Sequence, residues 1–394
     1  MDGILLYGAG DNCKAILDMG VLSRFNVLAI IDKYNYNTMI CGLPVVHPKT
    51  IKDYDFDSII ITLSDPSEII YELKEEYGIV DNILDLSFIN GLCLSFVRTS
   101  TKFIMISLGQ DHCDYPYAKM NENRDDFQMV RLLKFDHLNG DVVSYGKHIV
   151  VLLDTYYPDL VRMEFVKKMH WLFPNSKFVV LVYDTIDGAY GRIAQTNNVN
   201  YYNDLKMGFD CVVTYNPFEA KKYGMTYLEK WPFPKYTPIN EPDIDVFFVG
   251  RAKDRLGLIY SIYDKLNCYG LALSFWVYDI DNCLINYDYS INYNKWLSYK
   301  SVLKLCSESR CIIDLCKDGN VSELRYNQAV SMGKKLITND CTVVNRTYFN
   351  SNNILVISSD RDIDYDWILK KTDNYGYDET EVENLFLDYI EKVC

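Results

Sequence analysis

The chain has 394 residues, of which 49% are hydrophobic and 24% are charged, so it can build real hydrophobic cores and is not a disordered polymer. Its formal net charge of −14 argues against a general nucleic-acid binder, because such proteins carry a basic surface for phosphate groups. No apolar run reaches the roughly 18 residues that span a bilayer, so no transmembrane helix is expected.

Residues 1–97 are predicted to form a first α/β domain, in which short strands and helices alternate. The expected strands are apolar runs at residues 4–7, 27–31, 58–63 and 82–86. Alternation of buried strands with helices is typical of a doubly wound parallel sheet, as in Rossmann-like folds.

The turn after the first strand contains two glycines, Gly8 and Gly10, and the second strand ends at Asp32. Such glycines let the backbone approach a phosphate, and an acidic residue about 20 positions further on can hold a ribose. Cys13 stands where the third glycine of the fingerprint would be, so the pattern fits a nucleotide site and a ligand-free nucleotide-type fold equally well. The domain resembles the N-terminal nucleotide-sugar-binding domain of sugar acyltransferases and polysaccharide-biosynthesis proteins, through residues 7–10, 31–32 and 42–45.

Residues 98–236 are predicted to form a second domain of the same type. Its expected strands are residues 103–108, 149–153, 177–183 and 211–214, and residues 110–126 are interpreted as an irregular polar stretch. A carboxylate follows each of the first three strands and is a candidate general base for an acceptor hydroxyl; these are Asp111, Asp154 and Asp184. For each of them the competing interpretation is a turn or a helix cap.

Three prolines between residues 232 and 238 predict an extended hinge, which leads into a third domain over residues 237–394. Its expected strands are residues 245–249, 272–278, 312–315 and 335–338. The loop after the first of these is basic for so acidic a chain and contains Gly250, Arg251, Lys253 and Arg255. At the carboxyl end of a parallel strand these cations can neutralise a diphosphate, whereas the competing interpretation is a solvated loop with local salt bridges.

The segment 314–339 is predicted to run from a strand through a glycine loop into a helix and then a further strand. Ser322 is expected to cap this helix and Gly333 to end it. In its first turn, Glu323 can hold ribose hydroxyls and Arg325 can clamp a diphosphate through parallel hydrogen bonds. Gly319 in the loop and Lys334 after the helix complete the predicted donor-binding set.

This segment resembles the donor-binding region of bacterial capsule and lipopolysaccharide glycosyltransferases of the GT-B type, which carry a Gly-Leu-Thr-x-Arg-x-x-Glu-Ala-Leu helix followed by Lys-Lys-Leu-Ile-Thr-x-Asn. The matching positions are Gly319, Arg325, Gln328–Ala329 and 334–339, and the family's helix glutamate is replaced by Gln328. The likeness covers roughly residues 100 to 390. Strand-first restarts at residues 4, 103 and 245 predict three Rossmann-like units. The likeness implies that the last two pair around a cleft, with the acceptor in the second and the nucleotide in the third.

The resemblance implies transfer of a sugar from a nucleotide-diphosphate donor to a surface-polysaccharide or polyprenyl-linked oligosaccharide acceptor, with no cofactor and no metal. A location in the cytoplasm, at the inner face of the membrane, is expected, because residues 1–6 lack a basic signal region and the twelve cysteines are scattered without a CxxC pair. The amphipathic helix predicted over residues 159–172 faces the core in the main interpretation and contacts the membrane in the alternative.

Two other functions stay open at this stage. One is an NAD-dependent oxidoreductase or epimerase that uses Gly8, Gly10 and Asp32, although no Tyr-x-x-x-Lys pair stands at a suitable place. The other is a sugar-nucleotide-binding protein without catalytic activity.

Overall fold

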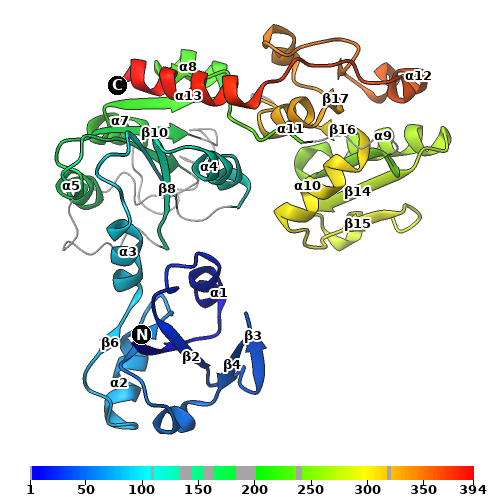
Figure 1. The fold of residues 1–394 in the computed structure, drawn as a ribbon. Helices are drawn as coiled ribbons and strands as arrows, with labels where there is room; N and C mark the ends of the chain where they lie inside the picture. Colours follow the sequence, from blue (N-terminus) through cyan, green and yellow to red (C-terminus); the bar gives the residue numbers. More distant parts are fainter. Residues whose placement is uncertain are drawn as a thin grey trace. The chain divides into compact units, whose positions relative to one another are not determined.

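The computed structural model describes residues 2–107, 111–133, 144–154, 163–182, 201–236, 242–316 and 321–394. It is an α/β structure with three six-stranded sheets (Figure 1), which confirms the predicted fold class of three Rossmann-like units. Packing groups the described residues into two compact units: 2–107, 123–133, 144–154, 163–180 and 201–210 in one, and 111–122, 181–182, 211–236, 242–316 and 321–394 in the other. This division differs from the three predicted domains, whose boundaries near residues 97 and 236 stay predictions.

The N-terminal sheet has the strand order β3-β4-β2-β1-β5-β6. Its strands are β1 (Gly3–Tyr7), β2 (Asn26–Ile31), β3 (Thr38–Ile40), β4 (Leu43–Val46), β5 (Ser58–Ile61) and β6 (Ile83–Leu84). All pairs are parallel except β3 with β4. The helices are α1 (Asp11–Asp18) and α2 (Ser67–Glu75), and α3 (Leu86–Ser95) follows β6. Leu5, Ile31 and Ile61 are fully buried, as expected for strands with helices on their faces.

The second sheet has the order β12-β11-β10-β9-β7-β8. Its strands are β7 (Phe103–Ser107), β8 (Phe127–Arg131), β9 (Ile149–Asp154), β10 (Lys177–Val182), β11 (Cys211–Thr214) and β12 (Thr226–Tyr227). The helices between them are α4 (Asp111–Asn123), α5 (Met163–Leu172), α7 (Tyr201–Gly208) and α8 (Pro217–Tyr223).

Two segments of this domain test the sequence predictions. Residues 110–126 were predicted to be irregular but contain helix α4, so that prediction was wrong. Pro116 lies inside this helix and argued against a helix in the sequence, although Tyr117 and Met120 are fully buried. Helix α5 buries Phe165, Met169 and Leu172, which supports the core-facing interpretation of its apolar side. No helix in the described part of the chain is long and apolar enough to cross a membrane.

The third sheet has the order β15-β14-β13-β16-β17-β18, and every neighbouring pair is parallel. Its strands are β13 (Ile244–Arg251), β14 (Leu273–Tyr278), β15 (Ile291–Tyr293), β16 (Ser309–Asp314), β17 (Lys335–Thr338) and β18 (Ile354–Val356). Its helices are α9 (Leu256–Cys268), α10 (Tyr299–Ser307), α11 (Leu324–Met332), α12 (Tyr365–Leu369) and α13 (Glu379–Val393). The strand order reverses between β13 and β16, where doubly wound sheets form a ligand crevice.

Alternation along the strands divides the core of this sheet into two layers. Phe248, Ile313 and Ile337 pack on one face with residues of α9 and α12, and Phe247, Ile312 and Leu336 on the other with residues of α10 and α11. Successive strand residues point to opposite faces, so continuous apolar runs are needed where helices cover both. The sequence is therefore consistent with the observed double layer.

The proline-rich segment before this sheet is extended and firmly packed over its described part. Trp231 and Phe233 are buried, and the backbone N–H of Phe233 donates to the Tyr377 hydroxyl at 3.1 Å while that hydroxyl donates to the Phe233 carbonyl. The Tyr236 hydroxyl donates to the Tyr115 hydroxyl at 2.6 Å. Residues 231–236 are therefore anchored by aromatic side chains.

Candidate functional site

The carboxyl edge of the third sheet gathers the polar residues that follow its central strands. Arg251 ends β13, Asp314 ends β16 and Thr338 ends β17, and parallel strands bring these ends to one edge. Strand β13 continues through Gly250 and Arg251, so the prediction that these two residues belong to a loop was wrong. They extend the ladder because Gly250 pairs with Val277 and Arg251 with Tyr278.

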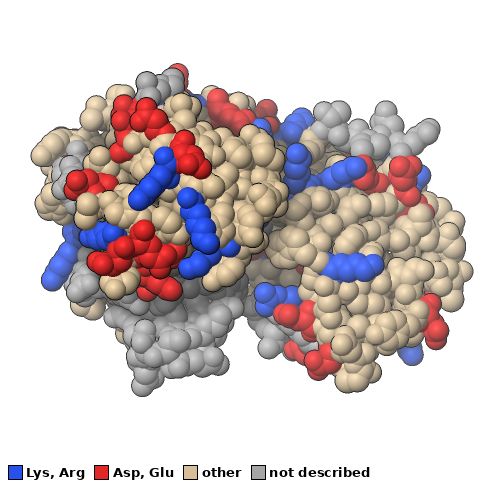
Figure 2. Space-filling model, turned by 90° about the horizontal axis from the view of Figure 1, so that it is seen from below, with Lys and Arg blue, Asp and Glu red and all other residues tan. Residues whose placement is uncertain are grey.

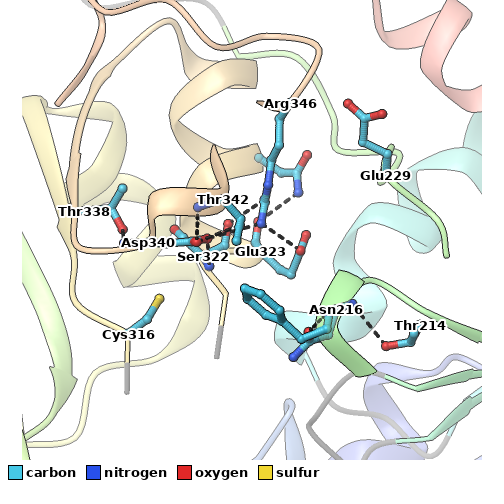
Figure 3. Close-up of polar contacts among 12 residues, drawn as sticks. Thr214, Asn216, Glu229, Cys316, Ser322, Glu323, Thr338, Asp340, Thr342 and Arg346 are labelled. Atoms are coloured by element: carbon cyan, nitrogen blue, oxygen red, sulfur yellow. Dashed lines mark hydrogen bonds and ion pairs between the residues drawn. The ribbon is translucent and has the colours of Figure 1, made fainter. Parts of the chain in front are cut away.

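Ser322 lies at the centre of a largely buried hydrogen-bond network at this edge and is drawn with Asp340 and Thr342 in Figure 3. The Ser322 hydroxyl donates to Asp314 Oδ2 at 2.6 Å, and its backbone N–H donates to Asp340 Oδ2 at 2.8 Å. Thr342 donates from both its backbone N–H and its hydroxyl to Asp340 Oδ1. Together these bonds fasten the beginning of α11 to the ends of β16 and β17.

Arg346 completes this network from the short 3-10 helix after β17 and points toward Asp340 and Glu323 (Figure 3). Its guanidinium donates to the Ser322 carbonyl at 2.9 Å, to Glu323 Oε1 at 3.0 Å and to Asp340 Oδ2 at 3.3 Å. All three side chains of this charge cluster are buried or nearly so. Two carboxylates share one guanidinium, and burial raises the pKa of Glu323 to about 8 against the opposing effect of Arg346.

Two predicted roles in this segment are corrected by these contacts. Ser322 does not cap α11; the cap position is Glu323, without a side-chain capping bond, because the Ser322 hydroxyl is bound to Asp314. Glu323 is ion-paired with Arg346 and mostly buried, so its carboxylate is engaged within the protein. The predicted helix end at Gly333 is confirmed, with φ of +64°, a backbone that glycine adopts without strain.

Arg325, in the first turn of α11, is held by the residue one turn further on. Its Nη1 donates to Gln328 Oε1, and Gln328 Nε2 donates to the Tyr299 hydroxyl at 2.9 Å. Gln328 is fully buried, so its amide orients both partners. Burial raises the pKa of Asp314, and the hydrogen bond from Ser322 and the charges of Arg325 and Arg255 oppose that shift.

The two arginines that follow Gly250 are joined to one another through the backbone. Arg255 Nη2 donates to the Arg251 carbonyl at 2.7 Å. Arg251 forms an ion pair with Asp279 at 3.3 Å, in which both side chains are about two-thirds exposed, 66% and 64%. Such an exposed pair contributes little stability and leaves the guanidinium free to exchange its partner for a ligand. Arg255 Nε is buried and has no hydrogen-bond partner among the described residues.

Several predicted residues are not brought to this edge or lie outside what is described. Lys334 precedes β17 and therefore sits at the amino edge of the sheet, opposite Arg251 and Asp314. Asp184 and Gly319 lie outside the described residues. The backbones of Lys253, of Asp111 at the start of α4 and of Asp154 at the end of β9 are described, but their side chains are not.

In the glycine loop of the N-terminal domain, the backbone requires glycine at Gly8 but not at Gly10, which has φ of −79° and room for a side chain. Gly8 has φ of +108°, and a Cβ there would lie 2.9 Å from Thr62 Oγ1, so only glycine fits. Asp32 Oδ2 accepts from the Ala9 N–H at 2.8 Å, and Oδ1 accepts from the N–H groups of Tyr34 and Asn35. Burial acts to raise the pKa of Asp32, but these N–H donors hold it below its ordinary value. The Asp32 carboxylate thus fastens the loop itself.

The residues that sequence reasoning missed are Asp340, Arg346 and the positioning role of Gln328. Asp340 directly follows the matching Lys-Lys-Leu-Ile-Thr-Asn run, which is the one signal that pointed near it. Arg346 lies 23 positions after Glu323, a separation at which sequence spacing predicts no contact. Among the described residues, no group of His, Cys, Asp or Glu side chains could hold a metal ion.

Comparisons with known proteins give one family match and distant structural likenesses. The profile of a family described as "C2185-like, N-terminal" matches residues 1–83. No curated protein matches the chain. The trehalose-6-phosphate synthase OtsA aligns over 100% of both chains with 10% identity and a TM-score of 0.39.

Two further solved structures align at still lower scores. The spinosyn rhamnosyltransferase SpnG covers 100% of this chain and 91% of its own with 9% identity and a TM-score of 0.28. D-lactate dehydrogenase from Escherichia coli covers 74% of this chain and 97% of its own with 12% identity and a TM-score of 0.22. Scores this low assign no activity, so the function is argued from the site.

Proposed function

We propose that the protein is a glycosyltransferase of the GT-B type that binds a nucleotide-diphosphate sugar at the carboxyl edge of the third sheet. The observation that carries this proposal is the placement of three arginines where the strand order reverses: Arg251 ends β13, Arg255 is bound to its carbonyl, and Arg325 lies in the first turn of α11 after β16. Ligands of doubly wound sheets bind at such switch points. The sequence resemblance of residues 314–339 to glycosyltransferase donor sites supports the same assignment.

The chemistry of sugar transfer explains the need for these cations. Cleavage of the bond between sugar and diphosphate leaves negative charge on the leaving group, which preorganised guanidinium groups stabilise. Arginine binds phosphate oxygens through parallel N–H donors, and its planar group needs a fixed orientation to do so. The hydrogen bond from Arg325 to Gln328 supplies that orientation. In this proposal leaving-group charge is met by arginine without a metal.

The acceptor is proposed to be a surface polysaccharide or a polyprenyl-linked oligosaccharide, bound by the second domain at the cytoplasmic side of the membrane. An inverting reaction needs a general base there, and Asp111, Asp154 and Asp184 remain the candidates. This part of the proposal rests on the sequence resemblance and on the positions of these residues after predicted strands.

Calorimetric titration with UDP-, GDP-, CDP- and dTDP-sugars and with NAD tests the proposal. The wild-type protein is expected to bind one sugar nucleotide, and Arg251→Ala and Arg325→Ala each to weaken it at least tenfold. Arg361→Ala is the matched control for the loss of one positive charge. Arg361 contacts Lys265 in the last turn of α9, whereas Arg255 lies at the beginning of that helix. Binding of NAD alone, or unchanged sugar-nucleotide binding in both arginine variants, would overturn the assignment.

Catalysis is tested separately from binding. The donor identified by calorimetry is incubated with lipid-linked oligosaccharide acceptors, and release of the nucleoside diphosphate is followed. Loss of transfer in Arg325→Ala with retained folding supports the proposal. Donor binding without turnover with any acceptor favours a sugar-nucleotide-binding protein that is not an enzyme.

A further inference from the structure

A cavity of about 720 Å³ opens at the amino edge of the third sheet, opposite the carboxyl edge that carries the candidate donor site. Its walls come from the segment before the sheet, the beginning of β16, the end of α11 and the segment after α12. Small-molecule sites usually occupy about 300–1,000 Å³, so the cavity is of ligand size.

The charge of the cavity is opposite to that of the chain. Five basic residues line it and the described lining contains one acidic residue; the basic ones are Lys235, Arg310, Lys334, Lys370 and Lys371, and the acidic one is Asp373. The chain as a whole has a net charge of −14. On the face shown in Figure 2, acidic and basic side chains are interspersed on a largely uncharged surface. A basic concentration around one cavity is therefore a local feature.

Lys334 is the most informative member of this set because it is 4% exposed. Its backbone is fixed on both sides, since its N–H donates to the Ala329 carbonyl and its carbonyl accepts from the Tyr375 hydroxyl, each at 2.8 Å. Its ammonium group has no hydrogen-bond or ion-pair partner among the described residues. Burial, together with the nearby charge of Arg310, lowers the pKa of Lys334 to about 8.

The acidic groups near the cavity are committed to other partners. Asp245 accepts from Arg310 Nε at 2.9 Å, and Asp373 accepts from the side chains of Asn350 and Asn352. A buried ammonium group without a counter-ion is unfavourable, and a bound anion removes that penalty. Arg310 is therefore compensated by Asp245, and the positive charge that the lining presents to a ligand comes mainly from Lys334 and the exposed pair Lys370–Lys371.

We propose that this cavity is a second anion site, which binds a phosphate or diphosphate ester through Lys334, Arg310 and the lysine pair Lys370–Lys371. The rings of Tyr236, Tyr375 and Tyr377 also line it, and their hydroxyls are bound to Tyr115, Lys334 and Phe233. These rings can therefore contact a sugar or other organic moiety attached to the phosphate. The site does not depend on the proposed donor site, which lies at the other edge of the sheet.

Titration of the full chain with sodium pyrophosphate at low ionic strength tests the proposal. The measurement is made in an Arg251→Ala/Arg325→Ala background, so that the candidate donor site does not contribute. Pyrophosphate is expected to bind in this background, and Lys334→Met is expected to weaken it at least tenfold, whereas Lys334→Arg, which keeps the charge, retains most of the affinity. The exposed pair is tested with Lys370→Gln/Lys371→Gln, which is expected to weaken binding severalfold without affecting folding.

Lys392→Gln, an exposed lysine of α13 that does not line the cavity, is the matched control for loss of one positive charge. Competition by glucose 1-phosphate or by vesicles containing phosphatidic acid distinguishes a soluble ester from a lipid headgroup. The proposal is overturned if pyrophosphate does not bind in the arginine background, or if the Lys334 and Lys370/Lys371 variants bind it as the background protein does. Because the sites are separate, loss of sugar-nucleotide binding in Arg325→Ala leaves this result unaffected.

Discussion

Arg325 donates a hydrogen bond to the side-chain oxygen of Gln328, one turn further along α11, and the amide of Gln328 is fixed in turn by Tyr299. Gln328 stands where the resembling glycosyltransferases carry glutamate. The fully buried amide of Gln328 needs no counter-ion. It accepts a hydrogen bond from Arg325 through its oxygen and donates one to Tyr299 through its nitrogen. The substitution therefore retains a means of orienting the arginine that precedes it.

Gln328→Met tests this positioning role. It keeps the volume of the side chain but removes the acceptor for Arg325, so donor affinity is expected to fall about tenfold, in line with ~1.5 kcal/mol for a hydrogen bond to a charged group. Calorimetry with the donor measures the loss. Gln328→Glu, which restores an acceptor, is expected to bind better than Gln328→Met; equal affinity of wild type and Gln328→Met would show that Arg325 needs no such support.

Arg346 is expected to be structurally essential at the start of α11. At a pH above 8, where Glu323 is ionised, Arg346→Met leaves Glu323 and Asp340 largely buried without their shared guanidinium, and breaking such a buried cluster costs about 3–5 kcal/mol. Urea unfolding followed by circular dichroism measures the change. In an Arg346→Met/Glu323→Gln variant one of the two carboxylates is gone, so part of the lost stability should return. If none returns, Arg346 does not stabilise the protein by pairing with both Glu323 and Asp340.

The buried Glu323 predicts a pH dependence of stability. Its pKa of about 8 in the folded protein lies above the ordinary value of 4.5, so between these values the folded state binds more protons than the unfolded state. The free energy of unfolding is therefore expected to decrease as pH rises from about 5 to 8. Denaturation midpoints across this range measure it, and Glu323→Gln should show a smaller slope. An identical slope in both proteins would rule out Glu323 as its source.

Lys334 predicts the opposite trend at alkaline pH. Its folded-state pKa of about 8 is below the ordinary 10.5, so the unfolded state binds more protons between these values and stability is expected to rise from pH 8 to 10. Lys334→Met is expected to raise the melting temperature at pH 7, because it removes a buried charge, with the gain shrinking toward pH 10. Differential scanning calorimetry at both pH values measures this. A destabilised Lys334→Met protein at pH 7 would contradict the absence of a counter-ion.

The amino-acid sequence by itself determined the central strands of each sheet, the α/β class and several local turns of this protein. The run of residues 335–338 forms β17, Gly333 ends α11, and Gly8 lies in a turn with φ of +108° where a Cβ would clash with Thr62. These features are local, because they depend on residue size, hydrophobicity and backbone freedom over a few positions. Three local predictions were wrong: α4 forms in spite of Pro116, Gly250 and Arg251 continue β13, and Ser322 does not cap α11.

Only the tertiary structure decided which charged groups meet. Glu323 was expected to face a ribose but pairs with Arg346, and Lys334 was grouped with the donor residues but lines a cavity at the opposite edge of the sheet. The physical reason is that a charged residue meets its partners according to the order of the strands in the sheet. It also depends on whether the residue lies at the amino or the carboxyl edge of that sheet. Arg310 and Lys334 come together because the parallel strands β16 and β17 align their amino ends, and the segments before β13 and after α12 bring Lys235 and Lys370 to the same cavity.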